Sequence, residues 1–334
     1  MKTAVFSTKS YDEEFLREAN EGTGLTLDFF EERMGTHMIP AIKGAEAICT
    51  FVNDPLPAAV LDELRSAGVR LIALRCAGFN QVDVKHAETI GIHVTHVPAY
   101  SPNAVAEFAL SLILTLNRRL HRAYNRVRDG NFSIDGLLGF DMQGSTVGVL
   151  GTGKIGVVFA RLLSGFGVKV LGSDPFENPD FVAAGGTYVP RNELLASSDI
   201  ISLHCPLTPD TFHVINEESI EVMKDGVMII NTSRGALVDA LAVIEGLKSG
   251  RIGYLGLDVY EQEADVFYEN LSEQIIQDDV LQRLVAFPNV LITSHQAYFT
   301  FTAMRNIAAT TIESLLSFRD GKPLKNAIPK NLIH

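Results

Sequence analysis

The sequence predicts an α/β protein with two doubly wound domains, each built around a parallel sheet. Short runs of β-branched and aliphatic residues alternate with helical patterns through almost the whole chain, which is typical of parallel sheets covered by helices. The length of 334 residues suggests two domains rather than one. A hydrophobic content of 46% is enough to fill a substantial core in each.

Charge and cysteine content narrow the possible partners and compartments. A net charge of −12 and a pI near 5.2 argue against nucleic acid or an anionic membrane as a partner. The three cysteines are widely spaced in apolar runs, as expected of reduced thiols in a cytoplasmic protein. Residues 1–6 resemble a strand rather than a signal peptide, and the apolar stretch 104–116 is too short to span a bilayer. No C-x-x-C or H-E-x-x-H motif occurs, so no metal site is expected.

The first hundred residues predict a small domain of their own. Strands are expected at residues 3–8, 26–29, 47–51, 71–74 and 93–96. Helical patterns lie between them, at 12–20 and at 57–67, and Gly68 follows the second as a C-terminal cap. A long helix is expected next, at 102–122. It is apolar on more than one face, which predicts burial between domains or in a subunit interface.

The most specific motif follows the next expected strand, 147–150. This strand runs directly into G-x-G-x-x-G, formed by Gly151, Gly153 and Gly156, and then into a helical pattern. In such a motif the first glycine permits a tight turn, the second lets a pyrophosphate approach the backbone, and the third lets the helix pack on the strand. The N-terminus of the helix adds N–H groups and the positive end of its dipole. The motif predicts a dinucleotide site of the Rossmann type.

Asp174 identifies the expected dinucleotide. It ends the following strand, 168–172, and lies 18 residues after Gly156. A carboxylate at this place can accept hydrogen bonds from both ribose hydroxyls and would repel a 2′-phosphate. Pro175 and Phe176 supply no arginine nearby. NAD is therefore expected rather than NADP.

The remaining segments complete this second domain. Strands are expected at 200–203, 227–231, 254–259 and 290–293, followed by a helix at 301–318. The tail is expected to return to the first half, because the second is already complete. We therefore expect residues 1–99 and 299–334 to form one discontinuous domain and residues 100–298 to form the other.

Polar side chains follow three of these strands, where ligands bind in parallel α/β sheets. They are Arg234, the pair Glu261 and Glu263, and His295. An arginine can bind a carboxylate with two hydrogen bonds and polarise the adjacent carbonyl. A histidine can protonate the alkoxide that forms when a carbonyl is reduced, and a carboxylate can hold that histidine charged. Local pattern does not separate Glu261 from Glu263, and His204 is a rival histidine that could be purely structural.

The sequence resembles the D-2-hydroxyacid dehydrogenases over nearly its whole length. The matching segments are 148–156, 203–208, 231–235, 258–263 and 294–295. The resemblance implies a Rossmann NAD domain inserted into a flavodoxin-like substrate domain. It also implies that Arg234 binds the substrate carboxylate, that Glu263 is the histidine's partner, and that His295 is the general acid.

The resemblance implies further contacts to the cofactor and the substrate. Around the cofactor it implies Lys154 and Ile155 at the pyrophosphate, Asp174 at the adenosine ribose, Cys205 and Pro206 near the adenine, and Thr211, Thr232, Ser233, Arg234 and Asp258 completing the site. Around the substrate it implies backbone N–H groups of the loop containing Ala77 and Gly78, which assist Arg234 with the carboxylate.

Within the family, the chain looks like the NAD-dependent, fermentative D-lactate dehydrogenase branch. Ala264 stands where most relatives have proline, and Tyr298 and Phe299 stand where most have small residues. Tyr298 and Phe299, together with Tyr100, would line an aromatic pocket suited to a small 2-keto acid.

The expected reaction is the reversible reduction of pyruvate to D-lactate by NADH. A longer branched or aromatic 2-keto acid is the alternative substrate, and an NAD-sensing, corepressor-like binding protein is the alternative class. By the resemblance, the helix at 102–122 would form the contact of a homodimer or homotetramer.

Overall fold

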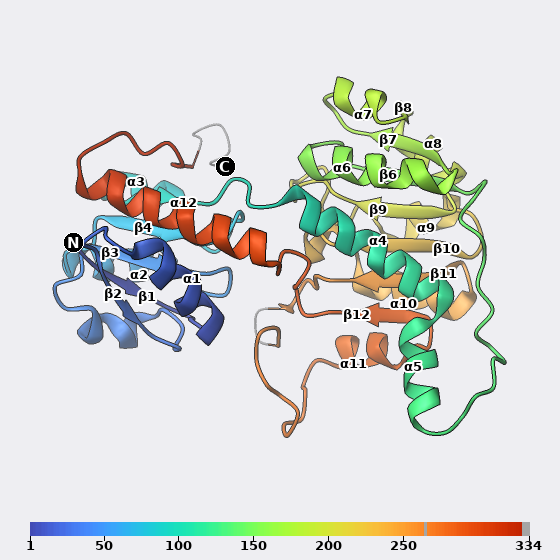
Figure 1. The fold of residues 1–334 in the computed structure, drawn as a ribbon, viewed down its shortest axis with the longest axis horizontal. Helices are drawn as coiled ribbons and strands as arrows, with labels where there is room; N and C mark the ends of the chain where they lie inside the picture. The colour runs from blue at the N-terminus through green and yellow to red at the C-terminus, as the bar shows by residue number, and fades with distance from the viewer. Residues whose placement is uncertain (264–265, 329–334) are drawn as a thin grey trace. The chain divides into compact units, whose positions relative to one another are not determined.

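The computed structural model describes residues 1–263 and 266–328, and the chain divides into two compact units (Figure 1). One unit consists of Met1–Ser101 with the chain from Phe299 onward, and the other is Pro102–Tyr298. The boundaries expected from the sequence, 1–99 with 299–334 and 100–298, differ from this division in assigning residues 100 and 101 to the second unit. Ala264, on which part of the resemblance rests, lies outside the described residues.

The first unit is a five-stranded parallel sheet with the order β2-β1-β3-β4-β5. Its strands are β1 (Lys2–Val5), β2 (Thr26–Phe29), β3 (Ala47–Thr50), β4 (Leu71–Leu74) and β5 (His93–Thr95). This is the strand order of flavodoxin-like doubly wound folds, so the expected class of this unit is confirmed.

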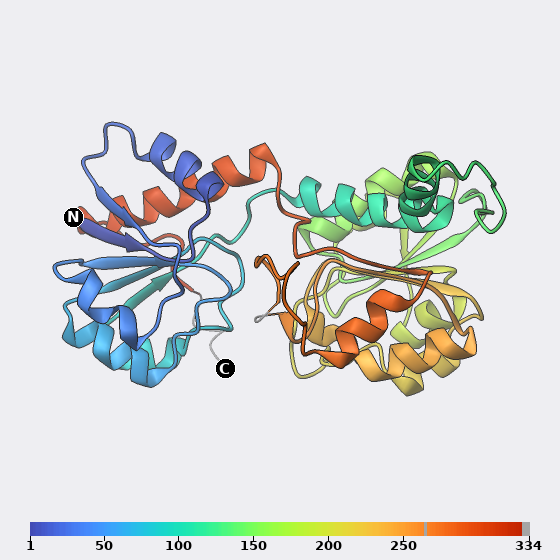
Figure 2. The same ribbon diagram turned by 90° about the horizontal axis from the view of Figure 1, so that it is seen from below.

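Helices cover both faces of the first sheet (Figure 2). One face carries α1 (Ser10–Asn20) and α12 (Phe301–Arg319), which pack on each other and share a core with alternate residues of β3 and β4. The other face carries α2 (Ala58–Ser66), α3 (Val84–Thr89) and the 3₁₀ helix η1 (Thr36–Ile42). The two faces take alternate strand residues because successive side chains of a strand point to opposite sides.

The second unit is a seven-stranded parallel sheet with the order β12-β11-β10-β9-β6-β7-β8. Its strands are β6 (Thr146–Leu150), β7 (Lys169–Ser173), β8 (Gly186–Tyr188), β9 (Ile200–Leu203), β10 (Val227–Asn231), β11 (Ile252–Leu257) and β12 (Val290–Ile292). The six strands β8-β7-β6-β9-β10-β11 have the strand order of the Rossmann fold, and β12 adds one further strand at the edge. The expected fold class is thereby confirmed. The direction of winding reverses between β6 and β9, which is where ligands bind in such sheets.

Helices also cover both faces of the second sheet (Figure 2). One face carries α4 (Pro102–Arg118) and α6 (Lys154–Leu163), followed by the 3₁₀ helix η2 (Ser164–Phe166). The other face carries α8 (Arg191–Ser197), α9 (Glu217–Val222), α10 (Ala240–Ser249) and α11 (Asp279–Ala286), with the 3₁₀ helix η3 (Gly235–Leu237). The short helix α7 (Pro179–Ala183) precedes β8.

The helix expected at 102–122 is two helices. The chain turns at Arg119, whose φ is +50°, and continues as α5 (Leu120–Arg128). The buried residues of α4 pack on α6 and on β10 and β11 of the same unit. A Cβ on Gly256 in β11 would lie only 3.1 Å from Cδ1 of Leu116, which shows how closely α4 lies on the sheet. Its own unit therefore accounts for much of the apolar surface that suggested an interface.

Within the described part of the chain, no helix has the length and apolar content needed to cross a membrane.

Candidate active site

The glycine turn after β6 has the shape that a dinucleotide needs. Gly151 has a φ of +94°, and a Cβ there would collide with the backbone of Cys205, so the position requires glycine. A Cβ at Gly156 would collide with the carbonyl of Gly151. A Cβ at Gly153 would meet nothing within 4 Å, so the backbone is open to an approaching group. Helix α6 begins directly after Gly153 and presents its first N–H groups at this turn.

Asp174 follows β7 and is bonded to the glycine turn. The Thr152 N–H donates to its Oδ2 at 2.8 Å, and the Phe176 N–H donates to its Oδ1 at 2.9 Å. Each carboxylate oxygen can accept more than one hydrogen bond, so capacity remains for the hydroxyls of a ribose. Lys154 and Ile155, expected at the pyrophosphate, are the first two residues of α6. The residues of this turn therefore fit a dinucleotide.

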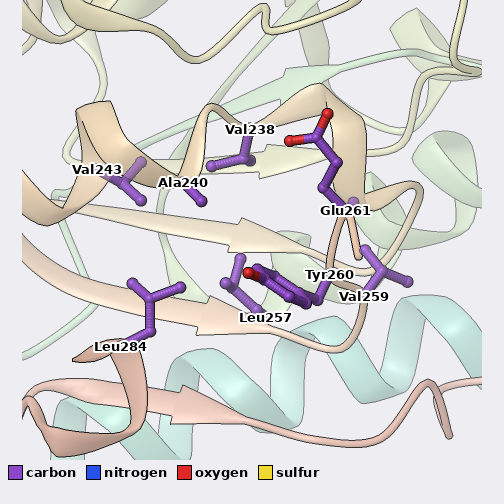
Figure 3. A pocket seen from close by; sticks show the side chains of 9 residues that line it. Val238, Ala240, Val243, Leu257, Val259, Tyr260, Glu261 and Leu284 are labelled. Atoms are coloured by element: carbon purple, nitrogen blue, oxygen red, sulfur yellow. The ribbon is translucent and has the colours of Figure 1, made fainter. Parts of the chain in front are cut away.

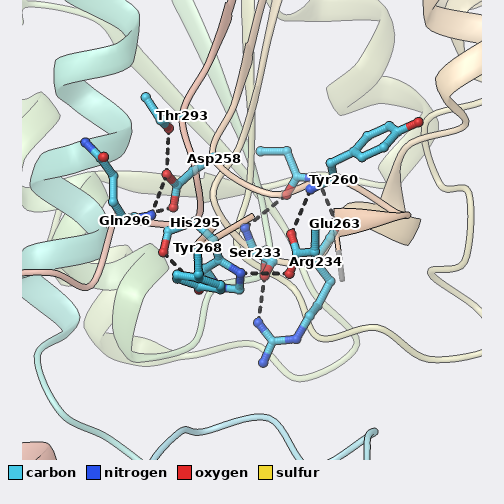
Figure 4. A network of polar contacts seen from close by, with 11 residues as sticks. Ser233, Arg234, Asp258, Tyr260, Glu263, Tyr268, Thr293, His295 and Gln296 are labelled. Atoms are coloured by element: carbon cyan, nitrogen blue, oxygen red, sulfur yellow. Dashed lines mark hydrogen bonds and ion pairs between the residues drawn. The ribbon is translucent and has the colours of Figure 1, made fainter. Parts of the chain in front are cut away.

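The second group of polar side chains follows β10, β11 and β12, and three of its members lie together (Figure 4). His295 Nδ1 is 2.8 Å from Glu263 Oε1, and the two side chains are 18% and 23% exposed, so the pair is largely shielded from water. The other oxygen of Glu263 accepts the Tyr260 N–H at 2.9 Å. Arg234 lies beside the pair in Figure 4, and its Nη1 donates to the carbonyl of Ser233 at 2.6 Å.

Glu261, the other candidate carboxylate, belongs to a different pair. Its Oε2 is 3.2 Å from Nε2 of His213. A small pocket beside Glu261 is lined mainly by apolar side chains, among them Val238, Val243, Leu257 and Leu284 (Figure 3). The structure therefore brings Glu263, and not Glu261, to His295.

The backbone around His295 is held by Asp258. His295 has a φ of +54°, and its N–H donates to the carbonyl of Asp258 at 2.7 Å. Oδ1 of Asp258 accepts the Thr293 hydroxyl at 2.6 Å and the Gln296 N–H at 2.9 Å, and Oδ2 accepts the Ala297 N–H at 2.8 Å. Burial raises the pKa of the Asp258 carboxyl, while these hydrogen bonds act in the opposite direction. In this structure the Asp258 carboxylate fixes the histidine loop, and its contact with a cofactor stays a prediction.

His204, the rival histidine, is unsuited to proton transfer at neutral pH. Burial lowers its pKa to about 3, so the ring is neutral. Its Nε2 is 2.9 Å from the hydroxyl of Ser202, and its ring packs against Phe159 with centroids 4.9 Å apart. Burial raises the pKa of the neighbouring Cys205 thiol to about 11. The side chains of His204 and Cys205, which follow β9, are therefore both uncharged at neutral pH.

The other residues expected at the cofactor line the ends of β9 and β10. The hydroxyl of Thr211 donates to the carbonyl of Pro206 at 2.7 Å, and the hydroxyl of Ser233 donates to the carbonyl of Cys205 at 2.8 Å. The Thr232 hydroxyl is buried and has no hydrogen-bond partner among the described residues, which leaves it available to a ligand. Their contacts with a cofactor stay predictions.

The residues expected around the substrate are divided between the two units. Ala77, Gly78, Tyr100 and Phe299 belong to the first unit, and Tyr298 belongs to the second. In the second unit, the Tyr298 ring lies edge-on to His295 with centroids 6.4 Å apart. In the first unit, Phe299 lies edge-on to Tyr11 at 4.7 Å. The aromatic pocket that three of these residues would form stays a prediction.

Sequence reasoning missed two residues near these pairs. The hydroxyl of Tyr268 donates to the carbonyl of His295 at 3.2 Å, and its ring centroid is 6.0 Å from that of the imidazole (Figure 4). His213 is the partner of Glu261. Both lie in irregular segments, where no strand or helix period marks a residue as facing a site.

Fold and site together define a class of protein. A dinucleotide turn on a Rossmann sheet, with a carboxylate-paired histidine beside an arginine, is suited to hydride transfer between a nicotinamide cofactor and a carbonyl compound. A family model described as "D-isomer specific 2-hydroxyacid dehydrogenase, NAD binding domain" matches residues 110–297. The chain belongs to the D-isomer specific 2-hydroxyacid dehydrogenase family and is an NAD-dependent oxidoreductase.

Relatives match the chain along nearly its whole length. The D-lactate dehydrogenase of Escherichia coli (strain K12) is 51% identical over 328 residues, which cover 98% of this chain and 100% of the relative. The 2-hydroxyacid dehydrogenase A of Aspergillus oryzae is 48% identical over 332 residues, covering 98% and 95%.

Solved structures agree with this assignment. The apo structure of D-lactate dehydrogenase from Escherichia coli superposes with a TM-score of 0.90 at 49% identity, covering 98% of this chain and 100% of that one. The structure of D-lactate dehydrogenase with NAD⁺ from Lactobacillus jensenii gives a TM-score of 0.82 at 31% identity, covering 99% and 100%. The family resemblance, the fold and the NAD cofactor expected from the sequence are thereby confirmed.

Proposed function

We propose that the protein catalyses the reversible reduction of pyruvate to D-lactate by NADH, with His295 as the acid and base. The observation that carries this proposal is the 2.8 Å contact between His295 Nδ1 and Glu263 Oε1 beside Arg234, on the unit that binds NAD. The full-length likeness to proteins named D-lactate dehydrogenase supports the choice of substrate.

Each polar residue then has one task. When bound, NADH supplies the hydride that adds to the keto carbon. Arg234 binds the substrate carboxylate through two parallel N–H groups and polarises the neighbouring carbonyl. His295 holds Glu263 with Nδ1, which directs Nε2 to the carbonyl oxygen, where it delivers the proton. In lactate oxidation the same Nε2 takes the hydroxyl proton back.

We assign the selection of substrates by size to the aromatic residues Tyr100, Tyr298 and Phe299. The backbone N–H groups of Ala77 and Gly78 would help to bind the substrate carboxylate. A narrow aromatic pocket favours pyruvate over a branched or aromatic 2-keto acid, which is the competing substrate class. Replacing Phe299 by alanine is expected to reduce the preference for pyruvate. A binding protein that uses NAD occupancy as a signal is the competing class, and it would bind NADH without reducing any keto acid.

We also propose that the protein is a homodimer or homotetramer that works in the cytoplasm. Helix α5 and the segment after it expose a group of large apolar side chains: Leu120, Tyr124, Val127, Phe132, Ile134 and Leu138. A second copy of the chain would remove this surface from water. All three cysteines are buried, as expected of structural thiols in a reducing compartment. Light scattering on the purified protein and on Ile134→Ser with Leu138→Ser would test the assembly.

The direct test of the reaction is a chiral analysis of its product. Purified protein is incubated with NADH and a panel of pyruvate, 2-ketoisocaproate and phenylpyruvate, and the enantiomer of each product is measured. We expect D-lactate as the product, and a higher kcat/KM for pyruvate than for either bulky acid. L-lactate as product, or no keto-acid reduction while NADH still binds, would contradict the proposal.

A further inference from the structure

The strand β8 (Gly186–Tyr188), which the sequence did not indicate, brings a tyrosine to the dinucleotide turn. Tyr188 is the last residue of this edge strand and pairs in register with Gly172 of β7. Asp174, which we assign to the adenosine ribose, lies two residues beyond Gly172. Tyr188 therefore stands at the same end of the sheet as that carboxylate.

The Tyr188 hydroxyl joins two backbone segments. It is 2.6 Å from the hydroxyl of Thr152, and it accepts the N–H of Asn178 at 2.7 Å. Asn178 closes the ring, because its Nδ2 donates to the carbonyl of Thr152 at 3.1 Å. Thr152 stands between Gly151 and Gly153, and its side chain is buried. One hydroxyl thus ties the glycine turn to the residue that caps α7.

The same threonine also holds Asp174. The Thr152 N–H donates to Asp174 Oδ2 at 2.8 Å, and the Phe176 N–H donates to Oδ1. The segment from Asp174 to Asn178 is consequently attached to Thr152 at both of its ends. Any shift of Thr152 would move the carboxylate and the glycine turn relative to each other.

Packing sets the place of the Tyr188 ring independently of its hydroxyl. The ring lies against Phe181, with centroids 5.2 Å apart. A Cβ at Gly172 or at Gly186 would collide with the ring of Phe181, so both glycines leave room for it. Removing the hydroxyl alone should therefore leave the ring in place and take away only its hydrogen bonds.

We propose that Tyr188 is a positioning residue for the cofactor, whose hydroxyl fixes Thr152 and Asn178 and through them directs the Asp174 carboxylate at the adenosine ribose. The contacts of the Tyr188 side chain are with Thr152, Asn178 and Phe181, and not with the three residues assigned to catalysis. Its effect is confined to how tightly, and how selectively, the adenosine half of the dinucleotide is bound. The proposal rests on the assignment of Asp174, and it is independent of which keto acid is reduced.

The test is direct binding to the purified protein without substrate. NADH, NADPH and ADP-ribose are titrated against wild type, Tyr188→Phe, Asp174→Ala and the double variant. Losing one neutral hydrogen-bonding group is expected to weaken NADH binding about 3- to 10-fold in Tyr188→Phe. ADP-ribose should weaken by the same factor, because it carries the same ribose. NADPH binding should weaken less than NADH binding, so the ratio of the NADPH dissociation constant to the NADH dissociation constant should fall.

The double variant separates an indirect effect from a direct one. If Tyr188 acts through Asp174, the double variant binds NADH no more weakly than Asp174→Ala alone. Additive losses, equal weakening of NADH and NADPH, or unchanged NADH binding in Tyr188→Phe would each overturn the proposal. Thr152→Val removes the same hydrogen bond from its other end and is expected to reproduce the loss. Should Tyr188→Phe fail to fold, the cycle is run with Thr152→Val and Asp174→Ala, under the same criteria.

A matched control and a kinetic measurement complete the design. Tyr254→Phe makes the same chemical change elsewhere in the second unit and should leave NADH binding unchanged. At saturating NADH, the kcat and the pyruvate KM of Tyr188→Phe should equal those of wild type. A protein that reduces no keto acid, yet loses NADH affinity in Tyr188→Phe, would refute the proposed reaction and leave this inference standing.

Discussion

The described residues of the second unit include two histidine–glutamate pairs, and their differences separate a proposed proton donor from a structural contact. Both histidines have a positive φ, +54° for His295 and +47° for His213. Their partners, Glu263 and Glu261, lie two residues apart after β11. His295 uses Nδ1 for its glutamate at 2.8 Å, whereas His213 uses Nε2 at 3.2 Å and holds Nδ1 3.8 Å from Asp239.

The use of the ring nitrogens is the decisive difference. His213 has carboxylates near both nitrogens, so neither nitrogen faces a substrate. Nε2 of His295 has no hydrogen bond to a described residue, and it can therefore exchange a proton with a ligand. The His213 backbone also donates to the carbonyl of Ala236 at 2.9 Å. The pair formed by His213 and Glu261 thus ties together the segments that follow β9, β10 and β11. Residue type alone did not distinguish these roles.

The largest effect on activity should come from replacing the histidine of each pair, in separate variants. His295→Asn removes the proton donor and should lower kcat/KM for pyruvate by about 10³-fold. His213→Asn should change it by less than about 3-fold, because a partly exposed pair remote from the proton path is lost. Steady-state kinetics at saturating NADH measures both, and NADH titration checks that the site remains. Equal losses in the two variants would show that the pairs do not differ in function.

A third histidine shows what burial without a carboxylate does. The folded pKa of His204 is about 3, below the unfolded value of about 6.5, so between these values the unfolded chain binds a proton that the folded chain does not. Stability is therefore lost as the pH falls below about 6.5. From pH 7 to pH 5 this histidine should cost about 2 kcal/mol of unfolding free energy.

His204→Gln is the matching variant, because glutamine does not titrate in this range. Urea unfolding of the protein measures the unfolding free energy at pH 7 and at pH 5. The fall in this free energy between the two pH values should be about 2 kcal/mol smaller in the variant than in wild type. Equal falls would mean that His204 is protonated in the folded protein or is exposed to solvent.

The smallest effect should come from the structural pair. Glu261→Gln alters a partly exposed contact between side chains, so it should reduce the unfolding free energy by less than about 1 kcal/mol. For a unit of this size that corresponds to a fall in Tm of no more than about 4 °C. A differential scanning measurement beside wild type tests it. A fall several times larger would show that the pair holds the loops far more strongly than an ordinary surface contact does.

Much of the fold follows from the sequence because the strands are buried on both sides. The observed strands Leu71–Leu74, Ile200–Leu203 and Val227–Asn231 are buried throughout and have the bounds expected from their apolar runs. The strand β8 was missed because an edge strand of three residues carries no such run. The break at Arg119 was missed because an arginine, and not a glycine, takes the left-handed conformation there.

The site could be predicted only in part. Polar residues at strand ends placed Arg234 and His295, because the carboxyl ends of parallel strands share one edge of the sheet. Pattern alone could not choose between Glu261 and Glu263, since both follow the same strand without a period that separates them. Contacts such as that of Tyr188 with Thr152 join residues 36 positions apart. Such pairings depend on how strands are ordered in the sheet, which local sequence does not record.

The most direct test of the central claim compares Glu263→Gln with Glu261→Gln in pyruvate reduction at neutral pH. Oε1 of Glu263 lies 2.8 Å from Nδ1 of His295 and orients the ring so that Nε2 can reach a substrate. Glu263→Gln should therefore lower kcat/KM for pyruvate by roughly 10- to 100-fold. Glu261→Gln should stay within about 3-fold of wild type, because Glu261 contacts His213 and not His295. A loss in Glu261→Gln, with Glu263→Gln behaving as wild type, would contradict the account.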